Sequence, residues 1–344
     1  MRNIQTLHSH TINSDGALTH EQALKVCENN GISTLAFTDH DGVIDKKSLL
    51  NLKKYKGHVR WISGIEISSG LPIELGGKAT SNLHIVGLFV DPTNKNLVEH
   101  CELAKDARIT RMQKMVKNLK ELGFDISEED CIKASGGESV GRPHVVSALK
   151  SKSENLTIIE DLRLKMKADA KNNSELKKRY NSMMEQGERQ YPYQIFLSDD
   201  AYLPGVYVDY QYFLDMDYSV KLIRDAGGLA ILAHYFTCAR NIDESMLDGM
   251  LRDNRLNGLE TLYGFFALTK NEGTDIEKTI RNTQDIAKKL TAKHDKLESG
   301  GVDAHLESDF ENFANSSEYS NKSIGMVEKI IEKSGVNTTW SNIE

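Results

Sequence analysis

The sequence has no excess of positive charge and no long hydrophobic run. Its 43 Lys and Arg residues stand against 50 Asp and Glu residues, which gives a formal net charge of −7. This balance excludes a global basic field that would hold duplex nucleic acid, so any nucleic-acid contact must be local. Apolar runs such as Gly228 to Ala233 fall far short of the ~20 residues that a membrane-spanning helix needs, and we expect no membrane partner.

Cysteine is scarce and scattered. Cys27, Cys101, Cys131 and Cys238 lie far apart, without a C-x-x-C pair. This pattern favours free thiols in a reducing compartment over a disulfide framework. The first residues, MRNIQTLHSH, contain no apolar signal core, and we therefore expect a cytoplasmic protein.

The length and the apolar pattern favour an α/β protein. A chain of 344 residues with 39% hydrophobic and 27% charged residues predicts either two ordinary domains or one large α/β barrel with an insertion. A capping box at Thr19–Gln22 starts a helix, and a second helix over 218–225 ends at Gly227-Gly228. Short apolar runs alternate with helical patterns at both ends of the chain, as in a parallel sheet or barrel. The expected strands are 4–7, 35–38, 59–67, 83–90, 229–233, 258–261 and 297–301.

The middle of the chain lacks this alternation. From about residue 101 to 217 apolar residues recur at helical spacing, as in Met112, Met115, Val116, Leu119 and Leu122. We predict a helical insertion over 101–217 that caps a barrel built from 1–100 and 218–344. Ten basic and seven acidic side chains fall within 150–190, which favours a solvated helix face over a path for a phosphorylated substrate.

Histidines and acidic residues recur where the expected strands end, and His84 lies at the start of another expected strand. His8 and His10 form an H-x-H pair, and because alternate strand residues face the same side, both imidazoles can reach one metal. In a barrel of parallel strands, the carboxyl ends form the active-site face, where such side chains converge. A single residue of this kind is usually structural, but the whole set predicts a metal site. The candidate ligands are His8, His10, Asp15, His40, Glu66, His84, His234, Asp303 and His305.

The motifs around these residues resemble those of the PHP (polymerase and histidinol phosphatase) family in order and spacing. Within that family, the Gly-Arg-Pro-His segment and the helical insertion are most similar to the branch of metal-dependent phosphoesterases that act on nucleoside 3′,5′-bisphosphates and short 5′-phosphorylated oligonucleotides. The motifs are His8-Ser9-His10 with Ser14-Asp15-Gly16, Thr38-Asp39-His40-Asp41, Gly64-Ile65-Glu66, Gly141-Arg142-Pro143-His144, Ala233-His234 and Asp303-Ala304-His305.

The resemblance implies a distorted (β/α)₇ barrel of the TIM-like type with two to three divalent metal ions. One metal would be held by His8, His10, Glu66 and Asp303, with Glu66 bridging to a second metal bound by His84 and His234. The third would take Asp15, His40 and His305. This mixture of imidazoles and carboxylates suits Mn, Fe or Zn. The chain departs from the usual family motif at Tyr235 and Val302, where proline and serine are common.

The resemblance also implies hydrolysis of a small phosphorylated substrate by a hydroxide that bridges the metals. Arg142 and His144 would contact the phosphate, for which the planar guanidinium offers two parallel donors. The alternative is that they form a helix start with Pro143 in the first turn. Asp41 is either an orienting residue or proton donor beside His40, or a surface aspartate.

Three other activities remain open from the sequence. The same metal cluster would serve a phosphodiesterase that acts on a cyclic sugar phosphate. A non-catalytic PHP module is less expected, because all nine ligand positions are filled. An amidohydrolase that cleaves C–N bonds is the weakest alternative, since Arg142 favours an anionic group.

Overall fold

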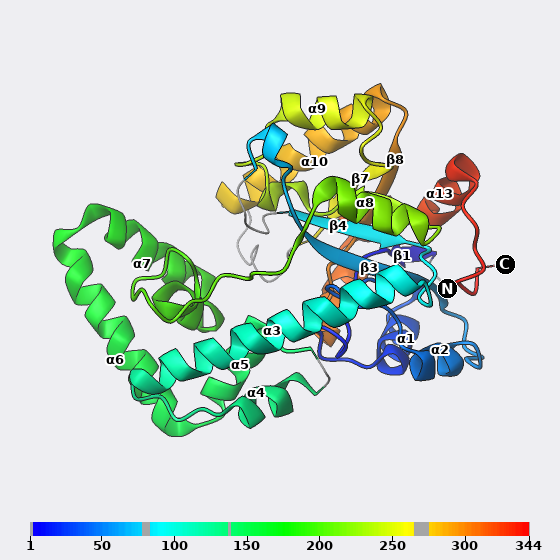
Figure 1. The fold of residues 1–344 in the computed structure, drawn as a ribbon. Coiled ribbons are helices and arrows are strands. Elements are labelled where there is room, and N and C mark those ends of the chain that lie inside the picture. Colours follow the sequence, from blue (N-terminus) through cyan, green and yellow to red (C-terminus); the bar gives the residue numbers. More distant parts are fainter. Residues whose placement is uncertain (1–2, 78–82, 137–138, 265–274, 344) are drawn as a thin grey trace. The chain divides into compact units, whose positions relative to one another are not determined.

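The structure is a computed structural model that describes residues 3–77, 83–136, 139–264 and 275–343 (Figure 1). The chain divides into two compact units, which we describe separately. The sheet unit comprises Met1–Ala104 and Tyr212–Glu344, and the helical unit comprises Lys105–Gln211. Helix α3 (Lys95–Glu121) begins in the first unit and ends in the second.

The sheet unit contains a mixed sheet in which most neighbouring strands are parallel. The hydrogen-bonded order is β1-β2-β3-β4-β6-β7-β8, with the short strand β5 paired to β3. The strands are β1 (Ile4–Thr6), β2 (Ile32–Phe37), β3 (Arg60–Gly70), β4 (Leu83–Leu88), β5 (Leu214–Asp215), β6 (Leu229–Leu232), β7 (Gly258–Tyr263) and β8 (Leu297–Gly301).

Strand β4 is the exception, because it runs antiparallel to both β3 and β6. Its first residues therefore lie beside the carboxyl-terminal half of β3, with His84 opposite Ser68. The alternation of apolar runs predicted a parallel sheet and did not indicate this reversal. The consequence is functional, since a side chain at the start of β4 reaches the same edge as side chains that follow β1, β2, β6 and β8.

The first and last strands approach each other closely. The Leu7 amide donates to the Gly300 carbonyl at 3.0 Å, and the His10 amide donates to the Ala304 carbonyl at 2.8 Å. An isolated parallel bridge joins Ser9 to Ala304. Gly301 permits this approach, because a Cβ at that position would lie 2.4 Å from the backbone nitrogen of His8.

All seven predicted strands are present; β8 has the predicted bounds, and the other six have shifted ends. Strand β2 begins at Ile32, where it pairs with Ile4 of β1, so it starts three residues before the expected range. Strand β3 continues to Gly70 because its second half pairs with β4. Strand β4 ends at Leu88, before Phe89 adopts a left-handed backbone with φ of 62°. The Thr19–Gln22 capping box is present as predicted.

The helices of the sheet unit pack against the sheet. Their buried apolar side chains join those of the strands in two hydrophobic clusters. Cluster residues on the helices are Leu24, Phe313 and Val327 in the first cluster and Ile223, Leu251 and Leu290 in the second. The helices are α1 (His20–Asn29), α2 (Lys46–Leu52), α8 (Met216–Asp225), α9 (Glu244–Arg252), α10 (Asp275–Lys293), α11 (Glu307–Asn315), α12 (Ser317–Ser323) and α13 (Met326–Ser334), with short turns η1 (Ile73–Leu75) and η5 (Tyr235–Thr237).

The helical unit has its own apolar core. The predicted face of α3 is buried at Met112, Met115, Val116 and Leu119, whereas Leu122 is 43% exposed. Leu122 follows the end of α3, which is at Glu121. The remaining elements are α4 (Glu128–Ser135), α5 (Arg142–Lys150), α6 (Ser153–Asp169), η2 (Ala170–Asn172), α7 (Ser174–Gln186), η3 (Glu188–Gln190) and the π-helical turn η4 (Tyr193–Leu197).

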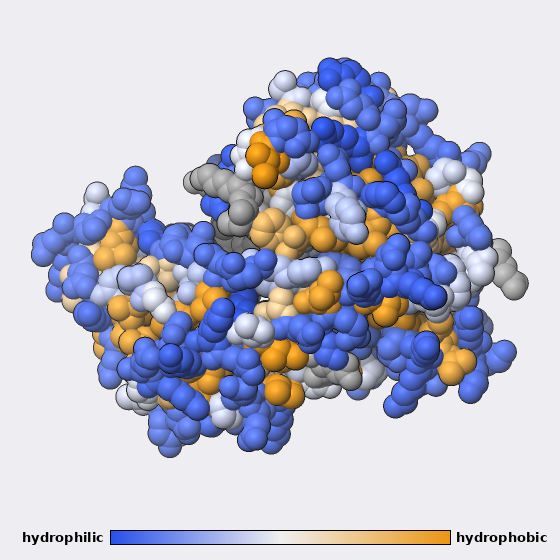
Figure 2. Space-filling model, in the orientation of Figure 1, coloured by the Kyte–Doolittle hydropathy of each residue, from blue (hydrophilic) through white to orange (hydrophobic). Residues whose placement is uncertain are grey.

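The charged stretch 150–190 forms mainly α6 and α7, where most charged side chains are exposed. Arg163 pairs with Glu160 there. The face visible in Figure 2 is mostly hydrophilic, with hydrophobic residues in small groups. All four cysteines are free thiols, as predicted. Among the described helices, none combines the length and the apolar character that crossing a membrane requires.

Candidate metal centre

The candidate ligands come together at the edge of the sheet where β1, β2, β6 and β8 end. Ser9 and Ala304 pair in a parallel bridge. In extended backbone, the residues on either side of such a pair direct their side chains to the other face of the two segments. This pairing brings His8 and His10 to Asp303. A second bridge, between His40 and Glu66, places the segment after β2 beside the middle of β3. Glu66 was predicted at the end of its strand, but it lies inside β3.

Glu66 is the centre of the cluster. Its side chain is fully buried, and its Oε1 lies 3.0 Å from His84 Nδ1 and 3.0 Å from His234 Nε2. Its Oε2 lies 2.9 Å from His40 Nδ1 and 3.2 Å from His8 Nε2. Since His10 Nε2 also lies 3.3 Å from Oε2, five imidazoles surround this carboxylate, three at Oε2 and two at Oε1.

Three groups of side chains have ligand atoms close enough to hold a metal ion. Within each group these atoms all lie within 4.8 Å of one another. His10, His40 and Glu66 each occur in two groups, and His234 enters the cluster through Glu66. The groups are His10, Asp15, His40 and His305; His8, His10, Glu66 and Asp303; and His40, Glu66 and His84.

Three buried polar atoms in this cluster have ion-pair contacts in the protein but no hydrogen bond. Asp15 Oδ1, His40 Nδ1 and Glu66 Oε2 are buried side-chain atoms without a hydrogen bond. A buried polar atom left without a partner is costly, and in native proteins it usually indicates an ion or water. Imidazole nitrogens and carboxylate oxygens are ligands for first-row transition metals. The residues present therefore fit divalent cations.

Opposite charges shift the pKa values of these groups. Burial alone would raise the pKa of Glu66, but His40, His8 and His84 hold it well below its usual range. Burial alone would lower the pKa of His305, but Asp15 and Asp303 raise it to about 10. Without metal, a protonated His305 is thus held beside carboxylates, whereas burial lowers the pKa of His40. Cations that bind there must displace protons from the imidazoles.

Two candidate ligands have a left-handed backbone. His234 has φ of 24° and Asp303 has φ of 51°, a conformation that costs about 1–3 kcal/mol for a residue other than glycine. Contacts with neighbouring residues stabilise these two conformations. The His234 amide donates to the buried carboxylate of Glu260, and Ala304, the residue after Asp303, pairs with Ser9. Both backbones therefore direct the side chains into the cluster.

Glu260 is a residue that the sequence analysis missed. It lies in β7, is 1% exposed, and its Oε1 is 2.9 Å from His8 Nδ1. Its Oε2 accepts the amide of His234 at 2.8 Å. A carboxylate on the second nitrogen of an imidazole fixes the ring orientation and raises the basicity of the nitrogen that faces a metal. An acidic residue inside the otherwise uncharged strand Gly258–Tyr263 was the available signal.

Asp39 holds the loop that follows β1. Its carboxylate accepts the Thr11 amide at 2.7 Å, the Thr11 hydroxyl at 2.8 Å and the Ser14 hydroxyl at 2.7 Å. Gly16 completes the loop, because a Cβ there would lie 2.4 Å from the His10 carbonyl oxygen. The loop conformation thereby sets the position of Asp15.

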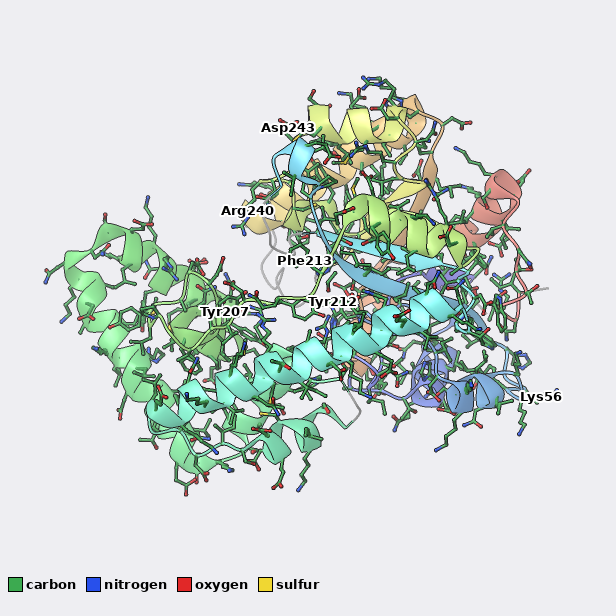
Figure 3. All side chains as sticks on the ribbon, viewed as in Figure 1. Lys56, Tyr207, Tyr212, Phe213, Arg240 and Asp243 are labelled. Carbon is green, nitrogen blue, oxygen red and sulfur yellow. The ribbon has the colours of Figure 1, made fainter. Side chains whose placement is uncertain are left out.

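Asp41 is buried rather than at the surface. Its Oδ1 accepts the Ser68 amide at 2.9 Å, and its Oδ2 accepts the Ser68 hydroxyl at 2.8 Å. His100 Nε2 lies 3.3 Å from Oδ1, and the other nitrogen of His100 is 3.1 Å from the hydroxyl of Tyr212 (Figure 3). Asp41 belongs to none of the three groups of metal-ligand type. A role as proton donor stays a prediction.

Arg142 and His144 lie in the helical unit, at the start of α5. The prediction of a helix start is confirmed, because the Gly141 amide donates to His144 Nδ1 at 2.9 Å and Pro143 lies in the first turn. Arg142 donates from Nη1 to the Leu197 carbonyl at 3.2 Å. Contact between these two residues and a phosphate stays a prediction.

Comparison with known proteins supports the resemblance in sequence. No family model matches the chain. The phosphoribosyl 1,2-cyclic phosphate 1,2-diphosphodiesterase of Eggerthella lenta is 30% identical over 149 residues, which are 43% of this chain and 55% of that enzyme. The 5′-3′ exoribonuclease Rnm of Escherichia coli is 30% identical over 151 residues, 41% of this chain and 46% of that enzyme.

A 3′,5′-nucleoside bisphosphate phosphatase of Chromobacterium violaceum is also 30% identical, over 124 residues that are 36% of this chain and 40% of the phosphatase. The chain therefore spans about half the length of the curated relatives that it matches. The matched enzymes all act on phosphate esters.

Solved structures show a similar fold over most of the chain. A predicted metal-dependent phosphoesterase of Bifidobacterium adolescentis aligns over 96% of both chains, with a TM-score of 0.62 and 19% identity. An amidohydrolase of Chromobacterium violaceum, solved with sulfate and without metal, aligns over 88% of this chain and 87% of its own, with a TM-score of 0.60 and 18% identity. These identities support likeness of fold alone. Together with the curated relatives, they confirm the resemblance of this chain to phosphoesterases of the PHP family.

Proposed function

We propose that the protein is a metal-dependent phosphoesterase that hydrolyses phosphate esters of nucleotides. One observation carries the proposal: the buried carboxylate of Glu66 lies within 3.3 Å of nitrogens from five histidines. Such a set of donors is costly to bury without a cation. In the similar enzymes the reaction is cleavage of a phosphate ester.

The proposed ligand sets follow the family resemblance. His8, His10, Glu66 and Asp303 would hold one cation, and Glu66 with His84 and His234 would hold a second. Asp15, His40 and His305 would hold the third. The groups of side chains with close ligand atoms support this assignment. We also propose that the contact between β1 and β8 closes the sheet as a distorted barrel around this edge, supported by the two backbone hydrogen bonds between the strand ends.

Divalent cations bound there would lower the pKa of a bound water and offset charge on the phosphoryl oxygens. The residues of the chain would prepare the site for that chemistry. Glu260 fixes the ring of His8 through Nδ1, and Asp39 holds the loop that carries Asp15. Arg142, from the helical unit, would orient a substrate phosphate through its paired donors.

The proposed substrates are nucleoside 3′,5′-bisphosphates and short 5′-phosphorylated oligonucleotides. Two of the matched enzymes act on such molecules by name, the bisphosphate phosphatase and the 5′-3′ exoribonuclease. A second candidate is a diester of a cyclic sugar phosphate, because another matched enzyme is named for phosphoribosyl 1,2-cyclic phosphate.

The test is product formation after chelation and addition of Mn²⁺: inorganic phosphate from adenosine 3′,5′-bisphosphate, a nucleoside monophosphate from a 5′-phosphorylated oligonucleotide, and a ring-opened monoester from a cyclic ribose phosphate. We expect turnover that requires Mn²⁺ and that is lost in Glu66→Gln. His58→Ala is the matched control, because His58 is exposed and belongs to none of the described groups of metal-ligand type. Turnover of none of the three substrates by the Mn²⁺-loaded protein would contradict the proposal and favour a non-catalytic module.

A further inference from the structure

The helical unit contains an alternating stack of arginine and tyrosine side chains. We call it the arginine–tyrosine ladder. The six side chains come from α3, from α5, and from the segment 193–210, and all six are half-buried. In spatial order the members are Tyr193, Arg142, Tyr207, Arg111, Tyr210 and Arg108.

Each guanidinium in the ladder lies over a tyrosine ring. The Arg142 guanidinium is 5.8 Å from the centre of the Tyr207 ring, and the Arg111 guanidinium is 5.1 Å from the same ring. Arg111 also lies 5.8 Å from Tyr210, and Arg108 lies 5.0 Å from that ring. Figure 3 marks Tyr207 on the segment that follows η4. The rings therefore separate the three positive charges and hold them in one row.

Two of these arginines are anchored by backbone and not by acidic side chains. Arg111 donates from Nε to the Val208 carbonyl at 2.6 Å, and Arg142 donates from Nη1 to the Leu197 carbonyl at 3.2 Å. Across the described ranges, neither arginine forms an ion pair with a carboxylate. Each guanidinium has five N–H donors, so most of the donors of both side chains have no protein acceptor among the described residues.

Arg163 of the same unit shows the ordinary arrangement. Its guanidinium lies 5.9 Å from the Tyr191 ring and bonds to the Tyr180 hydroxyl, and it also pairs with Glu160. Stacking on tyrosine is therefore compatible with a neutralising carboxylate in this unit. In the ladder, that neutralisation is missing at Arg111 and Arg142.

The neighbouring guanidiniums of the ladder affect the charge of Arg111. Burial, followed by the positive charges of Arg142 and Arg108, lowers the pKa of Arg111 to about 10. Half-buried cations that repel each other are stabilised by a bound anion, and a guanidinium fork matches the oxygens of a phosphate. The ladder has the composition of a site for a phosphorylated, aromatic ligand, since arginine and tyrosine both stack on nucleobases.

We propose that the arginine–tyrosine ladder binds the phosphate groups of a substrate or product that carries at least two of them, a nucleoside bisphosphate or a phosphorylated oligonucleotide. The row of three guanidiniums, with rings between them, suits several phosphates better than one. This inference rests on the proposed function and extends it, because it assigns substrate contact to Arg108 and Arg111 in addition to Arg142.

Protection from chemical modification tests the ladder in the wild-type chain. Phenylglyoxal modifies accessible arginines, and peptide mass mapping reports the modified positions. We expect adenosine 3′,5′-bisphosphate to slow the modification of Arg111 and Arg142 at least tenfold, and inorganic phosphate to protect much less at the same concentration. Arg163 is the internal control and should be modified at the same rate with and without the bisphosphate. Equal rates at Arg111 in both conditions would overturn the proposal.

A binding measurement separates this proposal from the proposed function. After chelation, calorimetry with adenosine 3′,5′-bisphosphate and with a 5′-phosphorylated dinucleotide should show about tenfold to hundredfold weaker binding to Arg111→Gln, because charge-assisted hydrogen bonds are lost. Arg163→Gln should bind as the wild type does. Unchanged affinity in a folded Arg111→Gln protein overturns the ladder even if the enzyme hydrolyses both substrates. Weakened affinity supports the ladder even if the Mn²⁺-loaded protein hydrolyses neither.

Discussion

The Nδ1 atom of His8 lies 2.9 Å from Oε1 of Glu260, so the Nε2 atom on the other side of the ring faces Glu66 at 3.2 Å. Glu260 therefore determines which nitrogen of His8 is directed to a cation. In Glu260→Gln, the side chain keeps its shape but loses the negative charge beside Nδ1 of His8. We expect metal affinity to fall about 10- to 100-fold, the usual effect of removing such a partner.

Titration with Mn²⁺ monitored by calorimetry measures this change. Glu298→Gln is the control, because Glu298 lies in the neighbouring strand β8, is exposed and bonds to Thr261 instead of a histidine. Wild-type Mn²⁺ affinity in a folded Glu260→Gln protein would show that Glu260 only packs β7.

Metal content should respond differently to two ligand substitutions. Glu66 has imidazoles beside both of its carboxylate oxygens. His305 instead contacts Asp15. Glu66→Gln should therefore lose about two bound cations per chain, and His305→Ala about one, since each cation depends on its charged ligands. Elemental analysis after reconstitution and dialysis gives the numbers, with Glu74→Gln as an exposed control. Equal losses in both variants would contradict the bridging role of Glu66.

Proton release should accompany metal binding. The pKa of His305 is raised to about 10 in the metal-free protein by Asp15 and Asp303, against burial. A cation at that position needs the neutral ring, so binding of Mn²⁺ near pH 7 should release at least about one proton per chain. Calorimetry in buffers of different ionisation enthalpy measures the number. Release should decrease as the pH approaches 10, and His305→Ala should release fewer protons than His294→Ala.

The same shift affects the stability of the metal-free protein. A histidine whose pKa is raised on folding contributes stability that is fully present below its unfolded value of about 6.5 and is lost as the pH rises towards 10. Thermal unfolding after chelation should therefore show a lower midpoint at pH 9 than at pH 6.5. His305→Ala should reduce that difference.

The candidate ligands could be picked out from the sequence because their signals are local. His8 and His10 are two residues apart at the end of a strand, and the alternation of side chains in a strand puts both on one face. The same holds for Asp303 and His305. These pairs need no knowledge of the partner strands.

Long-range relationships left no such signal. Glu260 is 252 residues from His8 in the chain, and an acidic residue in a buried strand does not show which partner it has. The direction of β4 was also hidden, because apolar alternation reads the same for a parallel and an antiparallel strand. The family resemblance nevertheless placed His84 in the metal site. The antiparallel direction of β4 explains how a residue at the start of a strand reaches that edge.

The loop glycine provides a test of the site geometry. A Cβ on Gly16 would lie 2.4 Å from the His10 carbonyl oxygen and 2.7 Å from the Thr11 nitrogen, so Gly16→Ala must displace the loop that carries Asp15. We expect destabilisation by about 1–3 kcal/mol in denaturant unfolding, as for overpacked sites, together with weaker Mn²⁺ binding. Gly249→Ala is the matched control. A Cβ there would meet its nearest neighbour at 3.7 Å inside α9, and alanine favours a helix by roughly 0.5–1 kcal/mol.

Substitution of Arg142 tests whether its side chain binds substrate or only stabilises the helical unit. If it binds a substrate phosphate, Arg142→Ala should lower kcat/KM for adenosine 3′,5′-bisphosphate by roughly 10- to 200-fold, equivalent to about 1.5–3 kcal/mol for a charge-assisted bond. Metal content should not change, because Arg142 belongs to none of the described groups of metal-ligand type. Arg142→Lys should restore only part of the loss, since an ammonium cannot make the two-pronged contact.

The competing role for Arg142 is packing, because its guanidinium stacks on Tyr193 and Tyr207 and bonds to the Leu197 carbonyl. In that case Arg142→Ala should lower the thermal midpoint and leave kcat/KM within about threefold of the wild type. Arg163→Ala is the control for the loss of a stacked arginine, since Arg163 is neutralised by Glu160. Measuring both quantities on the same preparations decides the matter: a large loss of kcat/KM in Arg142→Ala, with a thermal midpoint no lower than that of Arg163→Ala, assigns the guanidinium to the substrate.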